Sequence, residues 1–108
     1  MKAKKVDGLW SHVHWLGVLA EMGSFTAAAE RLGVSKAAVS QRINELEHFA
    51  GVPLVRRTTR TVRLTEAGQF LANATRSSFA DIERHFTEVK DLAGEPKGSL
   101  RITVPVAL

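Results

Sequence analysis

Residues 36–44 place a set of short or hydrogen-bonding side chains at the spacing of one helix face. The set consists of Lys36, Ala37, Ser40, Gln41 and Asn44. On an adjoining face, Val39, Ile43 and Leu46 recur three and four residues apart, which predicts an apolar stripe that packs on a core. A helix with an apolar back and a small polar front can enter the major groove of a duplex and hydrogen-bond to base edges.

A cluster of arginines follows within residues 54–64. Arg56, Arg57, Arg60 and Arg63 fall in this stretch, among valines and threonines that favour two short strands around a turn at 58–61. A strand that alternates its faces cannot bury four arginines, so most of them must face solvent or an anion. Guanidinium groups and threonine hydroxyls suit phosphate oxygens and a narrow minor groove. We therefore predict a nucleic-acid contact, with a solvated hairpin as the alternative.

Two short helices joined by a tight turn would position the polar face. Ser24 and Ser35 each have a side chain that can accept a free backbone N–H at a helix start. Gly33 lies where the first of these two helices must end, and glycine reaches a left-handed backbone without steric cost. The small Ala29 lets the second helix cross closely over the first. This spacing predicts a helix-turn-helix over 25–44; an ordinary helical hairpin is the alternative.

The elements before the helix-turn-helix form a basic lead-in over residues 1–8 and a first helix over 9–22. Apolar residues recur at helical spacing in this helix, including Leu9, Val13 and Leu16. His12 and His14 are two residues apart and point to different sides of a helix, so they are poor joint metal ligands. We expect both histidines at the surface or its boundary.

Composition excludes several classes of function. The chain has 108 residues and no cysteine, which excludes disulfides and thiolate chemistry. It has no apolar run long enough for a membrane helix and no signal-peptide core, which predicts a cytoplasmic protein. Residues 1–65 hold ten lysines and arginines against five acidic residues, whereas 66–108 hold five against six. The basic first part is typical of a surface that binds polyanions. We find no catalytic constellation, phosphate loop or metal spacing, so we predict no enzyme and no cofactor.

A long helix is predicted over residues 66–93, with Thr65 as its N-cap. Positions alternating four and three apart form a heptad seam that is apolar in its second half. Because a small domain cannot cover such a seam, we predict that the helix pairs with a second copy; packing on its own domain is the alternative for the first two turns. The predicted dimerisation residues are Ala72, Phe79, Ile82, Phe86 and Val89.

Three segments result from this pattern. They are a winged helix-turn-helix over 1–65, a linker or dimerisation helix over 66–93, and a hinge plus a strand without its sheet over 94–108. The predicted fold class is mainly α: a three-helix core with a short β-hairpin wing, followed by the long helix.

The sequence resembles the N-terminal DNA-binding domain of a LysR-type transcriptional regulator over about residues 9–104. The segments that carry the resemblance are GSFTAAAERLGVS at 23–35, AVSQRINELE at 38–47, GVPLVRRTTRTVRLTEAG at 51–68 and GSLRI at 98–102. The resemblance implies a bacterial regulator with a winged helix-turn-helix and a linker helix that pairs two subunits antiparallel. It also implies a full-length tetramer on interrupted inverted repeats of double-stranded DNA, with a small-molecule effector bound by a C-terminal α/β domain.

By position, the resemblance implies base-reading contacts at Lys36, Ala37, Ser40 and Gln41, and wing contacts at Arg57 and Arg60. Many members of the family have arginine at position 41, where this chain has glutamine, which can pair bidentately with adenine. We add Asn44 to the groove-facing set. The predicted phosphate and wing contacts are Ser24, Thr26, Arg42, Arg56, Arg57, Thr58 and Arg60. The rival interpretation is a winged-helix module that binds protein and has no affinity for DNA.

Overall fold

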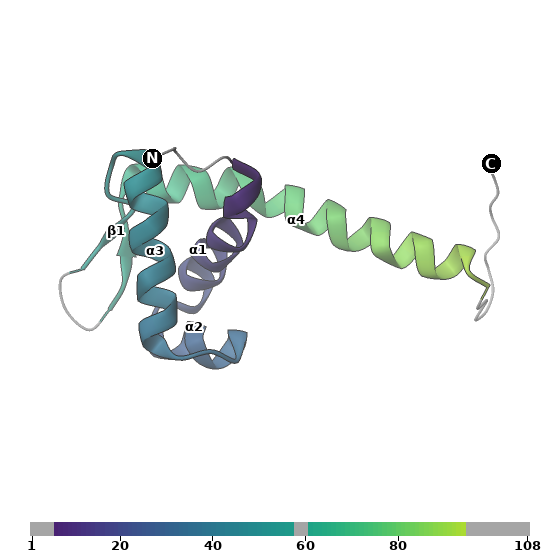
Figure 1. The fold of residues 1–108 in the computed structure, drawn as a ribbon, viewed down its shortest axis with the longest axis horizontal. Helices are drawn as coiled ribbons and strands as arrows, with labels where there is room; N and C mark the ends of the chain where they lie inside the picture. The colour runs from purple at the N-terminus through teal and green to yellow at the C-terminus, as the bar shows by residue number, and fades with distance from the viewer. Residues whose placement is uncertain (1–5, 58–60, 95–108) are drawn as a thin grey trace. The chain divides into compact units, whose positions relative to one another are not determined.

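The computed structural model describes residues 6–57 and 61–94. Over these residues the chain forms a 3₁₀ turn η1, four α-helices and two short strands (Figure 1). The elements are η1 (Val6–Leu9), α1 (Trp10–Met22), α2 (Phe25–Leu32), α3 (Lys36–Ala50), β1 (Val55–Arg56), β2 (Arg63–Leu64) and α4 (Glu66–Leu92). The predicted winged helix-turn-helix with a long following helix is confirmed. The predicted strand after the hinge lies outside the described residues.

The core lies where α1, α2 and α3 pack against one another. Leu16 and Leu19 of α1 and Val39 and Ile43 of α3 are completely buried there. The small Ala29 of α2 is also buried, as its position at the helix crossing requires. The apolar stripe predicted for α3 therefore faces the core, and this fixes which face of α3 is left outside.

Local capping defines both ends of the helix-turn-helix. The Ser24 hydroxyl accepts a hydrogen bond from the Ala27 N–H at 2.9 Å, and the Ser35 hydroxyl accepts one from the Ala38 N–H at 3.0 Å. Gly33 ends α2 with a φ of 73°, in the left-handed region. The predicted caps and the predicted stop are confirmed.

The two strands form an antiparallel hairpin in which Val55 pairs with Leu64 and Arg56 pairs with Arg63. Val55 is buried, whereas both arginines are exposed. The predicted wing is thus present, with each strand only two residues long.

The start of α4 packs against Pro53 and Leu54, the two residues that precede β1. The Thr65 hydroxyl donates to the carbonyl of Pro53 at 2.8 Å and accepts from the Gly68 N–H at 3.0 Å, which confirms Thr65 as the cap. Gly68 packs so closely that a Cβ at this position would overlap the carbonyl oxygen of Leu54. Ala72, one turn further on, is only 2% exposed and belongs to the core. Its prediction as a dimerisation residue is therefore wrong, because its own domain already covers it.

The chain divides into two compact units, Met1–Ser77 and Ser78–Leu108. The first unit contains the three-helix core, the hairpin and the beginning of α4. In the second unit, the described part of the chain is helical almost throughout and carries large exposed apolar side chains at Ile82, Phe86, Val89 and Leu92. Phe79 is half-buried.

Candidate nucleic-acid interface

The outward face of α3 carries the polar set that the sequence predicts. Lys36, Ala37, Gln41 and Asn44 are exposed, and Ser40 is half-buried. The face is held in this orientation because Val39 and Ile43 on the adjoining face are completely buried. Its hydrogen-bonding groups are accessible, and its small residues at 37 and 40 leave room for another surface to approach closely.

Two members of this face already have partners within the chain. The Gln41 Nε2 atom donates to the Glu45 carboxylate over 3.4 Å, one turn along the helix. The Asn44 Oδ1 atom accepts from the Arg57 guanidinium at 2.8 Å. Asn44 therefore connects the outward face of α3 to the wing. The sequence prediction of a groove-facing Asn44 did not include this contact.

Glu47 is the residue that attaches the wing to α3. Its Oε2 atom accepts from the backbone N–H groups of Leu54 and Val55 at 2.7 and 3.0 Å. Its Oε1 atom forms an ion pair with Arg57 at 3.3 Å. The Arg57 guanidinium also lies 5.7 Å from the centre of the Phe25 ring. The Glu47 carboxylate and Arg57 thus hold the hairpin beside α3.

Sequence reasoning missed Glu47 because an acidic residue near the end of a helix looks like ordinary solvent-facing charge. The available signal was its short distance in sequence from the hairpin, where the backbone N–H groups of Leu54 and Val55 need an acceptor.

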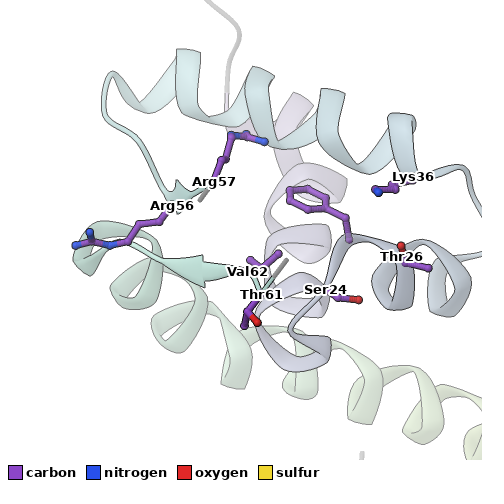
Figure 2. A pocket seen from close by; sticks show the side chains of 8 residues that line it. Ser24, Thr26, Lys36, Arg56, Arg57, Thr61 and Val62 are labelled. Carbon is purple, nitrogen blue, oxygen red and sulfur yellow. The ribbon is translucent and has the colours of Figure 1, made fainter. Parts of the chain in front are cut away.

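A cationic pocket opens between the start of α2, the start of α3 and the wing (Figure 2). It has a volume of about 360 Å³. Its lining residues are Ser24, Phe25, Thr26, Lys36, Arg56, Arg57, Thr61 and Val62. Five of the predicted DNA-contacting residues, from three elements, therefore line this pocket. In Figure 2 the Arg56 side chain points away from the other labelled groups.

The pocket has the electrostatics of an anion site. Backbone N–H groups at a helix N-terminus carry partial positive charge, and the first residues of α2 and α3 both line this pocket. Lys36 and Arg56 add positive charges, and Arg57 adds a third that is partly balanced by its ion pair with Glu47. No acidic residue lines the pocket among the residues that the structure describes. A phosphate group fits this combination of charge and hydrogen-bond donors.

Arg42, predicted as a phosphate contact, is engaged with α1. Its guanidinium donates to the Ser11 hydroxyl at 2.8 Å and lies 4.3 Å from the centre of the Trp15 ring. These two contacts connect α3 to α1. The other two predicted contacts in the wing, Thr58 and Arg60, lie outside the described residues.

His12 corrects the sequence prediction of a surface or boundary histidine. It is only 6% exposed, and its Nε2 atom lies 2.7 Å from Oε1 of Glu45. His14, by contrast, is exposed. His12 is buried because its position in α1 faces α3, and the Glu45 carboxylate supplies the hydrogen-bond partner that a buried ring nitrogen needs.

Residues 6–57 and 61–94 contain neither a candidate metal site nor a helix that could cross a membrane. No group of three or more histidine, cysteine or acidic side chains in this part of the chain could hold a metal ion. None of the described helices is long and apolar enough to span a membrane.

The family model for the bacterial regulatory helix-turn-helix protein, lysR family, matches residues 10–69. The chain is 41% identical over 95 residues to the HTH-type transcriptional regulator PtxR of Pseudomonas aeruginosa, covering 88% of the chain and 30% of that protein. It is 38% identical over 103 residues to the HTH-type transcriptional regulator PgrR of Escherichia coli, covering 95% of the chain and 33% of that protein. The chain thus spans about a third of the length of these curated relatives.

Solved structures of proteins in complex with DNA are also similar to this chain. The crystal structure of BenM DBD in complex with catB site 1 DNA is similar with a TM-score of 0.73 and 25% identity, over 81% of this chain and 97% of that one. Vibrio fischeri DarR in complex with DNA is similar with a TM-score of 0.67 and 31% identity, over 77% of this chain and 28% of that one.

Proposed function

Because the chain belongs to the lysR family of bacterial regulatory helix-turn-helix proteins, we propose that it binds double-stranded DNA sequence-specifically through the outward face of α3. It is the DNA-binding part of a transcription regulator, and the bacterial cytoplasm is the compartment in which it would act. The observation that carries the proposal is the position of the cationic pocket. Lys36 belongs to both the pocket and the polar face of α3, so one docking event can engage phosphate and base edges together.

In this proposal α3 lies in the major groove. Lys36, Ser40, Gln41 and Asn44 read or line the base edges, and Ala37 can contact a thymine methyl group. Gln41 is the residue with the most specific pairing, because its amide can donate to N7 and accept from N6 of the same adenine.

Phosphate contacts would fix the register of α3 in the groove. The proposed contacts are Ser24, Thr26, Arg56, Arg57, Thr58 and Arg60; for Arg42, the seventh predicted contact, the bonds to α1 favour attachment of α3 instead. The pocket geometry supports Ser24, Thr26, Arg56 and Arg57 most directly, since they line one cavity. Arg57 would act through the donors that it does not use for Asn44 and Glu47.

We further propose a homodimer formed through the apolar residues of α4, which would place two copies of α3 on an interrupted inverted repeat. The exposed side chains of Ile82, Phe86 and Val89 support this, because large apolar groups in a row favour a protein partner. The chain spans about a third of the length of its curated relatives, and we propose that the full-length protein forms a tetramer and responds to a small molecule bound by a C-terminal α/β domain. The division into residues 1–65, 66–93 and 94–108 belongs to the same proposal.

Selection of bound duplexes from a random pool tests the proposal. We expect the selected sequences to contain an inverted repeat and binding to weaken steeply with salt, since several phosphates are contacted. The Gln41→Ala variant should lose preference at one base pair of each half-site, at a cost of about 1–3 kcal/mol. A folded chain that binds no duplex, even in dilute buffer, would instead favour a winged-helix module that binds protein.

A further inference from the structure

A hydrogen-bonded chain of three side chains runs from the inside of the domain to the outward face of α3. His12 of α1, Glu45 of α3 and Gln41 of α3 form it, and we call it the His12–Glu45–Gln41 chain. The first link measures 2.7 Å between His12 Nε2 and Glu45 Oε1, and the second 3.4 Å between Gln41 Nε2 and Glu45 Oε2. The two contacts use different carboxylate oxygens of Glu45, so the carboxylate is oriented from both sides.

The inner end of the chain is rigid. His12 is 6% exposed, so core packing fixes its ring, whereas the Glu45 side chain is 39% exposed. Because an ionised carboxylate can only accept hydrogen bonds, the Nε2 atom of His12 must carry the proton that it shares with Glu45. A buried donor on α1 therefore determines where the Glu45 carboxylate lies.

The outer end of the chain determines which groups Gln41 presents. The amide of glutamine has two N–H donors and one carbonyl acceptor. One donor points to Glu45, which leaves one N–H and the carbonyl oxygen free on the exposed face. One donor beside one acceptor is the combination that matches N7 and N6 of adenine. A Gln41 side chain without this contact could rotate its amide by half a turn at little cost.

We propose that Glu45 and His12 are positioning residues that set the base preference of Gln41. This inference rests on the proposed function, and in particular on Gln41 as a reader of base edges. Neither positioning residue needs to touch the DNA: Glu45 orients the amide and His12 orients Glu45.

Substitution of Glu45 provides the sharpest test, because the two available replacements have different expected outcomes. In Glu45→Ala the Gln41 amide is no longer oriented. The preference for adenine at the base pair that Gln41 reads should therefore fall by about threefold or more, relative to the wild-type preference that a bidentate pair gives. In Glu45→Gln the new amide can accept from His12 and donate to the carbonyl of Gln41. Both N–H groups of Gln41 then face outward, and the preference should shift toward guanine, which presents two acceptors.

The preference is measured by competition among duplexes that differ only at the base pair identified with Gln41→Ala. In the Gln41→Ala background, Glu45→Ala should have no further effect on preference, because Glu45 acts only through Gln41. Glu21→Ala is the matched control, since it removes the same charge from an exposed position of α1. Any general gain in affinity from losing a negative charge should appear in the control as well, equally for all duplexes.

His12→Gln probes the inner end, and circular dichroism melting shows whether the variant is folded. A folded His12→Gln variant should keep a donor toward Glu45 and stay closer to wild type in preference than Glu45→Ala. If Gln41→Ala changes the preference and both Glu45 variants leave it as in wild type, the inference is overturned and the proposed function stands. If the wild-type chain binds no duplex, the proposed function itself fails.

Discussion

The exposed polar face of α3 and the exposed apolar face of the α4 segment at 78–92 have opposite chemistry. On α3, the exposed positions 36, 37, 41 and 44 carry short or hydrogen-bonding side chains. On the α4 segment, Phe86 is 65% exposed and Leu92 is 85% exposed, and Ile82 and Val89 lie on the same side by helical spacing. One face offers donors and acceptors to a polar partner, and the other offers apolar area.

This difference shows that the two helices depend on partners in different ways. The apolar side of α3 is already buried in the three-helix core, so α3 keeps its orientation without any ligand. Among the described residues, nothing buries Ile82, Phe86 and Val89 in a similar way. We therefore expect domain stability to depend on the beginning of α4, and self-association to depend on its later turns.

The largest effect should come from Gly68→Ala, which tests whether the beginning of α4 belongs to the domain core. The added Cβ would overlap the carbonyl oxygen of Leu54, a backbone atom that cannot rotate away. Either α4 or the backbone at Leu54 must shift, and we expect a loss of about 3 kcal/mol in the free energy of unfolding. Urea unfolding followed by circular dichroism measures this loss.

Gly17→Ala is the control, because Gly17 is also a helical glycine but has open space around a Cβ. Alanine is the better helix former, so this variant should gain up to about 1 kcal/mol. Equal stability of the Gly68→Ala variant and the wild type would mean that α4 does not depend on close packing at its start.

The next effect should come from Phe86→Glu, which tests the apolar face of the later turns. In a dimer that buries this side chain, a carboxylate would lose its hydration without gaining a partner, so association should weaken by about 2 kcal/mol or more. Sedimentation equilibrium measures the dissociation constant. The unfolding free energy of the three-helix core should not change, because Phe86 belongs to the other unit.

Ala80→Glu is the matched control for this prediction. It adds the same charge to an exposed position of the same helix, away from the seam formed by positions 79, 82, 86 and 89. We expect its dissociation constant to match that of the wild type. If both variants weaken association equally, the charge of the chain, and not the apolar face, controls dimerisation.

Features that depend on a few neighbouring residues could be predicted from the sequence. The caps at Ser24, Ser35 and Thr65 and the buried stripe of α3 need only local spacing, and all were confirmed. The polar face of α3 follows from the same spacing, since burial of one side leaves the other outside.

Features that join distant parts of the chain could not be predicted. Glu47 attaches to Leu54 and Val55 across a chain reversal, and His12 meets Glu45 over 33 residues. Ala72 has heptad spacing, but the close approach at Gly68 brings it into its own core. A periodic pattern indicates which side of a helix is apolar, and it does not indicate which partner covers that side.

The smallest effect concerns Arg42, which has two possible roles on α3: contact with phosphate, or attachment of α3 to α1. The hydrogen bond to Ser11 and the stacking on Trp15 favour attachment. If attachment is its main role, Arg42→Ala should lower the free energy of unfolding by about 1 kcal/mol, while the dependence of DNA affinity on salt stays as in wild type.

Arg56→Ala provides the opposite case, because Arg56 lines the cationic pocket and its guanidinium has no hydrogen bond to the described part of the chain. Its loss should leave unfolding nearly unchanged and reduce the salt slope of binding by about one phosphate contact, or ~0.9 in log–log units. Titrations at several salt concentrations measure the slope for both variants. A reduced slope in Arg42→Ala would show that Arg42 leaves Trp15 to bind phosphate. Arg42 would then belong to the surface of α3 that binds DNA, and not to the contacts that hold α3 against α1.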